Sequence, residues 1–335
     1  MKAFVMKGYG GPEQMGFAEV PLPECTPGTV RIKVHAAGLN PIDIKTRDGM
    51  TKAIQSYKLP AILGNECAGT VDAVGDGVSG FTIGERVATR VDKGRMGALA
   101  DYAVTTADTL AHIPDQVDMQ SAAGLPLAGE TALQALRNEI KVKPGDRILI
   151  TGGAGGVGTL AIQIAKAFGA RVITTASPRG RDLVKSLGAD EVIDYTSTDF
   201  TTVLRDLDGA FDLIGGKDLE NCFKVVRPGA TVVSIAGTPE PNTADDIGAS
   251  TLIRMVFWAM SVGLRRKAKA AGARYRFLFM RANGDDLATL FDMISAGKLR
   301  VIVDQTYPFE ATPKAFEALE SGHAKGKIIV QIAPT

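Results

Sequence analysis

Short runs in which apolar and polar residues alternate indicate β-structure in the first third of the chain. The clearest run covers 30–36, where valine, isoleucine and alanine occupy every second position and Arg31, Lys33 and His35 fall between them. This period of two is typical of a strand with one buried face, so we expect His35 to be a solvated strand residue. Glycines separate the further runs, which predict strands at 2–7, 69–74, 86–91 and 98–105. Many short strands with glycine turns favour a small antiparallel barrel.

The pattern changes near residue 121, where helical spacing begins to alternate with continuous apolar runs. Helices are predicted at 122–138, 181–187, 219–226, 285–296 and 313–321, and strands at 147–151, 171–176, 191–194, 211–215, 230–235 and 327–332. Such alternation is typical of a doubly wound parallel sheet. We therefore predict an α/β protein with two domains: a barrel domain at 1–121, completed by 284–335, and a parallel-sheet domain at 122–283.

Two segments of the second half give weaker patterns. The stretch 239–271 is interpreted as an irregular insertion that carries an apolar part, from Leu252 to Leu264, and then the basic run 265–269. We interpret the basic run as the solvated face of a helix. The segment 277–280 is predicted to be one more strand, which could pair with a second subunit in a homodimer or be covered within one chain.

Composition excludes several classes of partner. The chain of 335 residues has a net charge of +1, which gives no reason to expect nucleic acid as a partner. Its three cysteines are few and far apart, as expected in a reducing compartment. The first residues do not read as a signal peptide, and the apolar segment 251–264 is too short for a membrane span and carries Arg254. We expect a cytoplasmic protein without a membrane partner.

A glycine-rich turn follows the predicted strand at 147–151. Gly153, Gly155 and Gly158 match the pattern G-x-G-x-x-G, with Gly156 and Val157 between them, and helical spacing begins directly behind. In a strand–turn–helix unit the first glycine allows a tight turn, the second lets a pyrophosphate approach, and the third lets the helix pack on the strand. Free N–H groups at the helix start hold phosphates. The turn therefore predicts a dinucleotide site.

The end of the next predicted strand indicates which dinucleotide binds. A site for NAD places a carboxylate about 20 residues after the glycines, where it accepts from the ribose hydroxyls. This chain has Ser177 there, followed by Arg179 and Arg181. A hydroxyl and two guanidinium groups suit a 2′-phosphate. We therefore predict NADPH as the cofactor.

Three motifs then suggest a family. They are A-G-L-N-P-I-D-I-K-T-R-D-G at 37–49, A-G-L-P-L-A-G-E-T-A at 123–132, and the glycine turn at 152–158. With the order of predicted elements, they make the whole chain resemble the medium-chain dehydrogenase/reductase superfamily. It is most similar to the zinc-independent quinone oxidoreductase branch, the relatives of zeta-crystallin, and within it to the alkenal/enone reductases. The resemblance implies a GroES-like barrel as the catalytic domain and a Rossmann domain for NADP.

The resemblance also implies chemistry without a metal. The zinc-dependent cousins hold zinc at the positions of Asn40, Asn65 and Leu127, and none of these three side chains replaces a thiolate or an imidazole as a zinc ligand. Without a Lewis acid, the acceptor of the hydride has to be activated by its own conjugation. We therefore expect a small hydrophobic enone, enal or quinone as substrate.

Asn40 and Lys45 are the catalytic candidates that the resemblance implies. We expect both in a loop after the strand at 30–36, where Lys45 would contact the cofactor and donate to the substrate. A solvated loop lysine is the alternative for Lys45. The proton donor stays open, because relatives carry a tyrosine where this chain has Met50, and nothing fixes Tyr57 in the pocket.

The remaining cofactor contacts come from motif positions alone. The resemblance places Thr131 beside the nicotinamide and Tyr195 beside the adenosine phosphate, although Tyr195 could equally be a packing residue. It also assigns contacts with the cofactor to Ile235, Ala236, Gly237, Gly326 and Lys327.

Two further functions compete with enone reduction. A quinone reductase proper would differ only in its substrate. A non-catalytic NADPH-binding protein would share the fold, as a crystallin does, because fold does not determine function.

Overall fold

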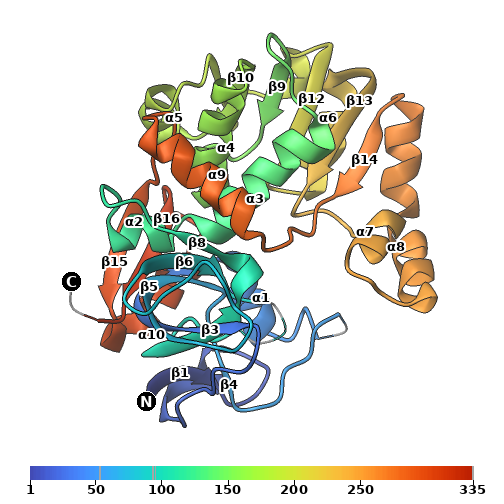
Figure 1. The fold of residues 1–335 in the computed structure, drawn as a ribbon. Helices are drawn as coiled ribbons and strands as arrows, with labels where there is room; N and C mark the ends of the chain where they lie inside the picture. The colour runs from blue at the N-terminus through green and yellow to red at the C-terminus, as the bar shows by residue number, and fades with distance from the viewer. Residues whose placement is uncertain (53, 93, 95, 334–335) are drawn as a thin grey trace. The chain divides into compact units, whose positions relative to one another are not determined.

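The computed structural model describes residues 1–52, 54–92, 94 and 96–333 of the chain (Figure 1). The described chain packs into two compact units. Unit 1 consists of Met1–Glu130 and Ala282–Thr335, and unit 2 of Thr131–Arg281. The predicted fold class is confirmed, because a mainly antiparallel sheet forms the first unit and a parallel sheet with helices the second.

Unit 1 is built on a large sheet with the strand order β15-β16-β3-β5-β6-β8, with β7 also paired to β3. These strands are β3 (Thr29–Leu39), β5 (Glu66–Val74), β6 (Arg86–Arg90), β7 (Tyr102–Thr106), β8 (Leu110–His112), β15 (Val303–Pro308) and β16 (Lys327–Gln331). Among their described pairings only β15–β16 is parallel. The alternation at 30–36 is confirmed, since Val30, Ile32 and Val34 are fully buried.

A smaller sheet and several helices complete unit 1. The small sheet has the order β2-β1-β4, with β1 (Lys2–Met6), β2 (Met15–Glu19) and β4 (Ala61–Ile62). The helices are α1 (Pro41–Arg47), α2 (Met119–Ala123), α9 (Gly284–Ser295) and α10 (Thr312–Glu320), with 3-10 turns at Pro12–Gln14, Ala107–Thr109 and Phe309–Ala311. The ring of Phe316 from α10 lies 5.9 Å from that of Phe4, so α10 joins the apolar core of the sheets.

Unit 2 contains a six-stranded parallel sheet with the order β11-β10-β9-β12-β13-β14. The strands are β9 (Arg147–Ile150), β10 (Arg171–Ala176), β11 (Glu191–Asp194), β12 (Leu207–Asp212), β13 (Val226–Ser234) and β14 (Arg274–Phe277). This is the order 3-2-1-4-5-6 of dinucleotide-binding folds, which reverses between β9 and β12. A ligand of such a sheet binds at the carboxyl ends of these two strands.

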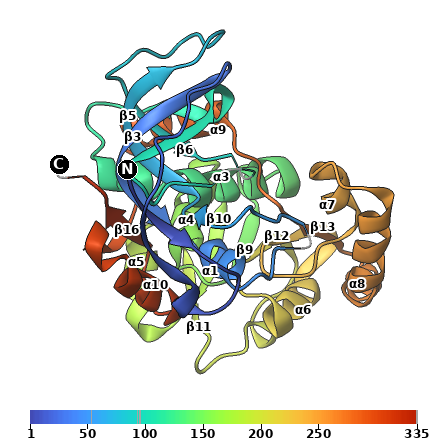
Figure 2. The ribbon, with the colours of Figure 1, turned by 90° about the horizontal axis from the view of Figure 1, so that it is seen from below.

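The helices of unit 2 connect the parallel strands. They are α4 (Gly156–Ala167), α5 (Arg181–Ser186), α6 (Gly216–Val225), α7 (Pro241–Asp246) and α8 (Thr251–Ala270), with 3-10 turns at Pro178–Gly180 and Phe200–Thr202. Helix α3 (Pro126–Gln134) leads from unit 1 into unit 2 and continues as a π-helical turn, Ala135–Ile140. Figure 2 shows α7 and α8 adjacent to each other.

The prediction of an irregular insertion at 239–271 is wrong, because the segment contains α7 and α8. Helix α7 starts at Pro241, which suits a first helical position, and Glu240 caps it by accepting from the Asn242 N–H at 2.9 Å. Helix α8 is capped by Ser250. Apolar residues lie on every side of its first half, which hid the helical period.

The strand predicted at 277–280 is also wrong, because β14 covers Arg274–Phe277. Its two arginines are paired: Arg274 donates to Thr231 Oγ1 at 3.2 Å, and Arg276 forms ion pairs with three carboxylates. These partners stabilise a strand whose sequence R-Y-R-F reads as polar. Since β14 is the last strand of the sheet, the predicted homodimer through this edge stays a prediction.

Smaller differences follow from local hydrogen bonds. The strand predicted at 211–215 ends earlier, at Asp212, because the Asp212 carboxylate accepts from the Gly215 N–H and turns the chain. The single helix predicted at 122–138 is divided before Pro126, which starts α3. The strand predicted at 98–105 is β7, Tyr102–Thr106, and neither β2 nor β15 was predicted from the sequence.

Candidate active site

The segment that follows β3 is a helix and not the predicted loop. Asn40 precedes α1 as its N-cap, Pro41 occupies the first helical position, and the Asp43 carboxylate accepts from the Asn40 N–H at 2.8 Å. A proline at the first position and an acceptor at the third are start signals of a helix. Asn40 is therefore held rigidly at the end of β3, with its side chain only 3% exposed.

Strand register brings two distant residues to Asn40. In the antiparallel pairing, Leu39 of β3 lies opposite Ile328 of β16, and Gly38 lies opposite Glu66 of β5. Gly38 has no side chain, and a Cβ there would collide with the Glu66 carboxylate. The glycine therefore makes room for Glu66, and Lys327 enters from β16.

These three residues form a buried network. The Lys327 ammonium donates to Glu66 Oε1 at 2.7 Å, to the Leu39 carbonyl at 3.0 Å and to Asn40 Oδ1. Asn40 Nδ2 donates to the same Glu66 oxygen at 2.7 Å, and the Leu127 N–H donates to Glu66 Oε2 at 2.7 Å. The charges are thus both paired and hydrogen-bonded, as burial requires.

A second buried network lies directly beside the first. Asn65 Nδ2 donates to Asp43 Oδ1 at 2.6 Å, and Arg90 Nη2 donates to Asn65 Oδ1 at 3.3 Å. Burial raises the pKa of Asp43 to about 6, although the hydrogen bonds from Asn65 and Asn40 act in the opposite direction. Asp43 therefore holds a proton that an exposed aspartate would already have lost at mildly acid pH.

Two buried polar atoms of unit 1 have no hydrogen-bond partner among the described residues. They are Arg90 Nε and Glu130 Oε1, while Glu130 Oε2 accepts from the Asn283 N–H at 2.9 Å. Burial raises the pKa of Glu130 well above its usual range and lowers the pKa of Arg90. Burial therefore favours the neutral form of Glu130, which avoids the cost of an unpaired buried charge.

Lys45 does not take part in either network. It lies on α1 but on an exposed face of the helix, and its ammonium has neither a hydrogen bond nor an ion pair to the described residues. The structure therefore does not bring the two predicted catalytic residues, Asn40 and Lys45, together. Met50, which stands where relatives carry a tyrosine, is 70% exposed, and burial raises the pKa of Tyr57 to about 12.

The residues at the positions that correspond to the zinc ligands of the zinc-dependent enzymes do not fit that metal. Two are the amides of Asn40 and Asn65, and the third position, Leu127, contributes its N–H to Glu66. The Lys327 ammonium already neutralises Glu66, and burial raises the pKa of the nearby Cys67 thiol to about 12. Zinc binds deprotonated thiolates, neutral imidazoles and carboxylates. Across the described ranges, three or more such side chains never gather at one point.

The glycine turn of unit 2 follows β9 and ends at α4. Gly152, rather than Gly153, has the left-handed conformation, with φ of 65°. A Cβ on Gly158 would lie 2.7 Å from Gly153 Cα, so the third glycine of the motif lets the helix pack against the turn. Around Gly155 a Cβ would meet only the Gly152 carbonyl, at 3.5 Å. The turn is therefore open at the second glycine, where the motif requires a phosphate to approach.

The predicted phosphate-binding residues lie beside this turn. β10 ends at Ala176, and Ser177 begins the 3-10 turn Pro178–Gly180. A Cβ on Gly180 would come within 2.9 Å of Ala154 Cβ, so the two turns are in close contact. Arg179 and Arg181 are exposed and form no ion pair with the described residues. Both guanidinium groups are thus available to an anion next to the glycine turn.

Asp212 organises the carboxyl edge of the sheet, a role that sequence patterns did not indicate. Its buried carboxylate accepts from Thr151 Oγ1 at 3.2 Å, from Ser234 Oγ at 2.6 Å and from the Gly215 N–H at 3.0 Å. Ser234 Oγ in turn accepts from the Ala236 N–H at 3.1 Å. Asp212 therefore links the ends of β9, β12 and β13 and fixes the loop that contains Ile235, Ala236 and Gly237.

The other predicted cofactor residues lie in varied surroundings. Thr131 is buried in α3, and Tyr195 is 58% exposed after β11, which disfavours a packing role. Gly326 has φ of 112°, and a Cβ there would meet Ile302, so local packing already requires a glycine. Lys327 is 3% exposed, with its ammonium held inside unit 1.

Comparisons with known proteins agree with the two-unit architecture. A family model described as "Alcohol dehydrogenase GroES-like domain" matches residues 26–115, and one described as "Zinc-binding dehydrogenase" matches residues 187–330. The zebrafish mitochondrial NAD(P)H oxidoreductase RTN4IP1 is 34% identical, over 99% of this chain and 91% of the relative. The chloroplastic NADPH-dependent alkenal/one oxidoreductase of Arabidopsis thaliana is 36% identical, over 100% of this chain and 80% of the relative.

A solved structure is similar over its whole length. The quinone oxidoreductase of Coxiella burnetii superposes with a TM-score of 0.86 at 32% identity, covering 99% of each chain. The two curated relatives carry mitochondrial and chloroplastic names, so the expected cytoplasmic location stays a prediction. As to a membrane, none of the described helices combines the length and the apolar content that a crossing requires.

Proposed function

Because the chain belongs to the medium-chain dehydrogenase/reductase superfamily, we propose that it is an NADPH-dependent oxidoreductase that reduces an activated conjugated acceptor without zinc. The acceptor is a small hydrophobic α,β-unsaturated ketone or aldehyde, or a quinone. The names of the relatives support this proposal, since one is an NADPH-dependent alkenal/one oxidoreductase and another a quinone oxidoreductase. NADPH supplies the hydride for such a reduction.

One observation carries the proposal. At two of the positions where zinc enzymes of this family bind their metal, the chain has Asn40 and Leu127, and both are hydrogen-bonded into a buried network with Glu66 and Lys327. Such a network cannot polarise a simple carbonyl as a metal ion does. A conjugated acceptor needs less polarisation because its oxygen receives the charge through the π system.

Unit 2 supplies the residues that hold the cofactor in this proposal. The first four N–H groups of α4, including those of Gly156, Val157 and Gly158, have no acceptor within the helix and face a pyrophosphate. Ser177, Arg179 and Arg181 bind the 2′-phosphate beside them. Thr131, Tyr195, Gly153, Gly155 and the loop 235–237 complete the site, with Gly326 and Lys327 from the return segment. The functional domains are then 1–121 with 284–335 for catalysis and 122–283 for NADPH, which the two packing units support.

Asn40 and Lys45 act on the substrate in this proposal. The amide nitrogen of Asn40 has two hydrogens, and it donates one of them in a hydrogen bond to Glu66. The second hydrogen is available to the substrate oxygen, while Glu66 and Lys327 hold the amide in a fixed orientation. The exposed ammonium of Lys45 binds the cofactor and stabilises negative charge that develops on the substrate.

The test is NADPH oxidation against a panel of acceptors, with and without a metal chelator. We expect short enones or quinones to be reduced, simple aldehydes and ketones to be left unchanged, and the chelator to have no effect. Preference within the panel separates an enone reductase from a quinone reductase proper. Reduction of simple aldehydes that the chelator abolishes would contradict the proposal. Tight NADPH binding without turnover of any acceptor would favour the non-catalytic, crystallin-like alternative.

A further inference from the structure

Helix α8 exposes an unusual amount of apolar surface. Its sequence is T-L-I-R-M-V-F-W-A-M-S-V-G-L-R-R-K-A-K-A, yet only Phe257, Ser261 and Ala268 are buried. These three positions are four and seven residues apart, so they form one narrow stripe. Five large apolar side chains outside the stripe are more than two fifths exposed: Leu252 66%, Met255 58%, Val256 46%, Trp258 55% and Met260 58%.

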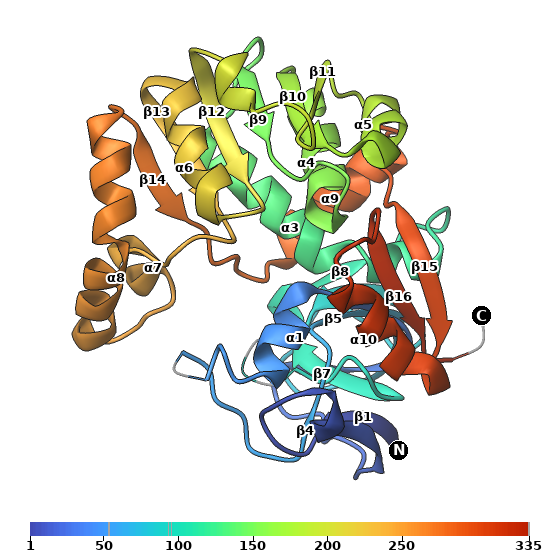
Figure 3. The ribbon, with the colours of Figure 1, turned by 180° about the vertical axis from the view of Figure 1, so that it is seen from behind.

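The buried stripe of α8 packs against α6, α7 and β14. Figure 3 shows the helix at the β14 side of the unit 2 sheet, with α7 next to it. The exposed apolar residues point away from this stripe, on the remaining faces of the helix. Single exposed apolar residues are common on folded domains. Several large ones on one helix instead indicate an interaction surface.

The same helix is strongly basic. It carries Arg254, Arg265, Arg266, Lys267 and Lys269 and contains neither aspartate nor glutamate. Arg254 is 3.5 Å from Asp245 in a pair with both side chains more than half exposed, and Lys267 pairs with Glu220. The other three cations have no ion pair with the described part of the chain. The apolar face is therefore accompanied by uncompensated positive charge.

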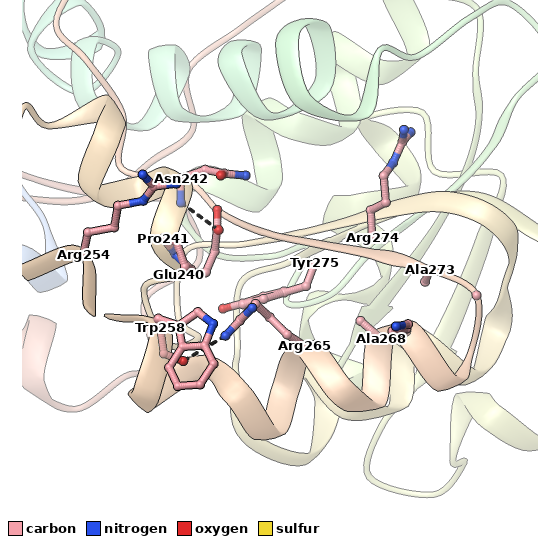
Figure 4. Close-up of a pocket in the computed structure, with 12 residues that line it drawn as sticks. Glu240, Pro241, Asn242, Arg254, Trp258, Arg265, Ala268, Ala273, Arg274 and Tyr275 are labelled. Carbon is pink, nitrogen blue, oxygen red and sulfur yellow. Dashed lines mark hydrogen bonds between the residues drawn. The ribbon is translucent and has the colours of Figure 1, made fainter. Parts of the chain in front are cut away.

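Part of this charge lines a cavity. The cavity has a volume of about 620 Å³ and lies between one flank of α8, the start of α7 and β14. Arg254, Arg265 and Lys269 line it from the helix, and Arg274 lines it from β14. Figure 4 shows Trp258 beside Arg265, whose guanidinium carbon lies 5.5 Å from the ring centroid.

The acidic residue of the cavity does not cancel these charges. Glu240 is 3% exposed, and its carboxylate is bound by Arg276 and by the Asn242 N–H. A ligand in the cavity would therefore meet several guanidinium and ammonium groups and the edge of an exposed indole. That combination matches an anionic head group attached to an apolar body.

We propose that α8 docks the protein on a membrane surface that contains anionic phospholipids. The helix lies in the plane of the interface, with Leu252, Met255 and Trp258 in contact with the acyl boundary. The basic cavity at its flank receives a lipid phosphate. This binding is peripheral, in keeping with the lack of a membrane-spanning helix in the described chain. The proposal replaces the interpretation of 265–269 as a merely solvated face and the expectation of no membrane partner.

Charge favours a lipid surface over a second copy of the chain. A symmetric pairing of α8 with its own copy would place five cations on each side of the contact and no carboxylate of either helix to meet them, and like charges repel. An anionic bilayer instead attracts every one of them. The exposed leucine, methionine and tryptophan side chains have no use on a nucleic acid, but they partition into the interface of a bilayer.

Trp258 makes the test direct, because it is the only tryptophan of the chain. Its fluorescence is measured with vesicles of phosphatidylcholine alone and with vesicles that also contain phosphatidylglycerol, and binding is quantified by co-sedimentation. We expect a shift of the emission to shorter wavelength and binding with the anionic vesicles, with binding weakened by salt.

Variants then separate the two parts of the surface. Arg265→Gln combined with Arg266→Gln should lower the partition coefficient about 30-fold, since each cation near an anionic surface contributes about a fivefold factor. Met255→Ser combined with Leu252→Ser should lower binding and leave the residual binding more sensitive to salt. The matched controls Arg171→Gln with Lys185→Gln, and Ile83→Ser, remove exposed cations and an exposed isoleucine elsewhere and should bind as the unmodified protein does.

Three results would overturn the proposal. In the first, anionic vesicles change neither the emission of Trp258 nor the sedimentation of the protein. The second is the same emission shift produced by soluble glycerol phosphate without vesicles, which would mean that the cavity binds a free phosphate ester. The third is an emission shift that depends on protein concentration alone, which would identify a second copy of the chain as the occupant.

Discussion

The Lys327 ammonium lies 2.7 Å from Glu66 Oε1, in a pair whose side chains are 3% and 0% exposed. Both partners make further hydrogen bonds, to Asn40, to the Leu39 carbonyl and to the Leu127 N–H. Removing one member of such a pair leaves the other buried without its counter-charge, whereas removing both does not. The pair therefore fixes the end of β3 as long as both charges are present.

The first prediction concerns this pair. Lys327→Met should lower the free energy of unfolding of unit 1 by about 3–5 kcal/mol, because Glu66 is then buried without a cation. The double variant Lys327→Met, Glu66→Gln should recover most of the loss. Urea unfolding of the three proteins, followed by circular dichroism, measures both changes.

An exposed pair provides the control. Lys166 and Asp190 are 2.8 Å apart, close to the separation of the buried pair, but about one third of each side chain is exposed. Lys166→Met should cost at most about 1 kcal/mol, because solvent screens the pair. If Lys327→Met costs no more than Lys166→Met, the buried pair has no structural role.

The second prediction concerns the pH dependence of stability. Burial raises the pKa of Asp43 to about 6, from a usual value of 3.8. Between about pH 4 and pH 6 the native chain then holds a proton that the unfolded chain has released, so stability falls as the pH rises through this window. In the Asp43→Asn variant this side chain is neutral at every pH. The difference in free energy of unfolding between the variant and the unmodified protein should therefore shift by about 3 kcal/mol in favour of the variant across the window.

The comparison is made by urea unfolding at several pH values, so that other titrating groups cancel. Asp190→Asn is the control of opposite sign. Partial burial, the largest single cause, acts to raise the pKa of Asp190, but the hydrogen bonds from Lys166 and the Val172 N–H and the charges of Lys166 and Arg171 together outweigh it, so the pKa is lowered. Asp190 therefore stabilises the fold above its unfolded pKa, and its removal should matter more as the pH rises. A difference between Asp43→Asn and the unmodified protein that does not change with pH would contradict the prediction.

The sequence predicted those parts of the fold that depend on local pattern. β10 ends at Ala176 as expected, because a continuous apolar run stops there and a turn begins. Helix α8 was missed for the opposite reason, since a helix that is apolar on every side has no period to detect. The exposed face of α8 can be identified only from the structure, which shows which few of its residues are buried.

Sequence patterns could not predict the buried network of Asn40, Glu66 and Lys327 for a different reason. Lys327 is 287 residues from Asn40 and 261 from Glu66 in the chain. Only the register of β16 on β3 and of β3 on β5 brings the three together. The motif resemblance placed Lys327 near a cofactor, but the strand pairing supplies its counter-charge.

The third prediction concerns cofactor choice. Arg179 and Arg181 are exposed beside the glycine turn, and neither has an ion pair among the described residues. NADPH should bind about 30- to 1000-fold more tightly than NADH, because the 2′-phosphate gains charge-assisted hydrogen bonds. Arg179→Ala combined with Arg181→Ala should remove most of this difference. Titration calorimetry with both cofactors measures it.

A neighbouring lysine provides the control for this variant. Lys185→Ala removes an exposed cation from the next turn of α5 and should leave the preference for NADPH nearly unchanged. Equal affinity of the unmodified protein for NADPH and NADH would contradict the prediction. An equal loss with Lys185→Ala would show that net charge, rather than two specific guanidinium groups, sets the preference.

The last prediction concerns Lys45, the proposed catalytic residue for which the structure shows no partner. Its ammonium is exposed on α1, five residues after the buried Asn40 that caps the helix. Lys45→Ala should lower kcat/KM for enones or quinones by about 10- to 1000-fold, as expected from the loss of one oriented charged donor. Lys45→Arg should restore only part of the activity, because a planar guanidinium does not replace an ammonium. Lys33→Ala, an exposed lysine of β3, is the control and should retain full activity. If Lys45→Ala binds NADPH and reduces every acceptor at the full rate, Lys45 is an ordinary solvated residue, and the second hydrogen of the Asn40 amide is left as the donor to the substrate oxygen.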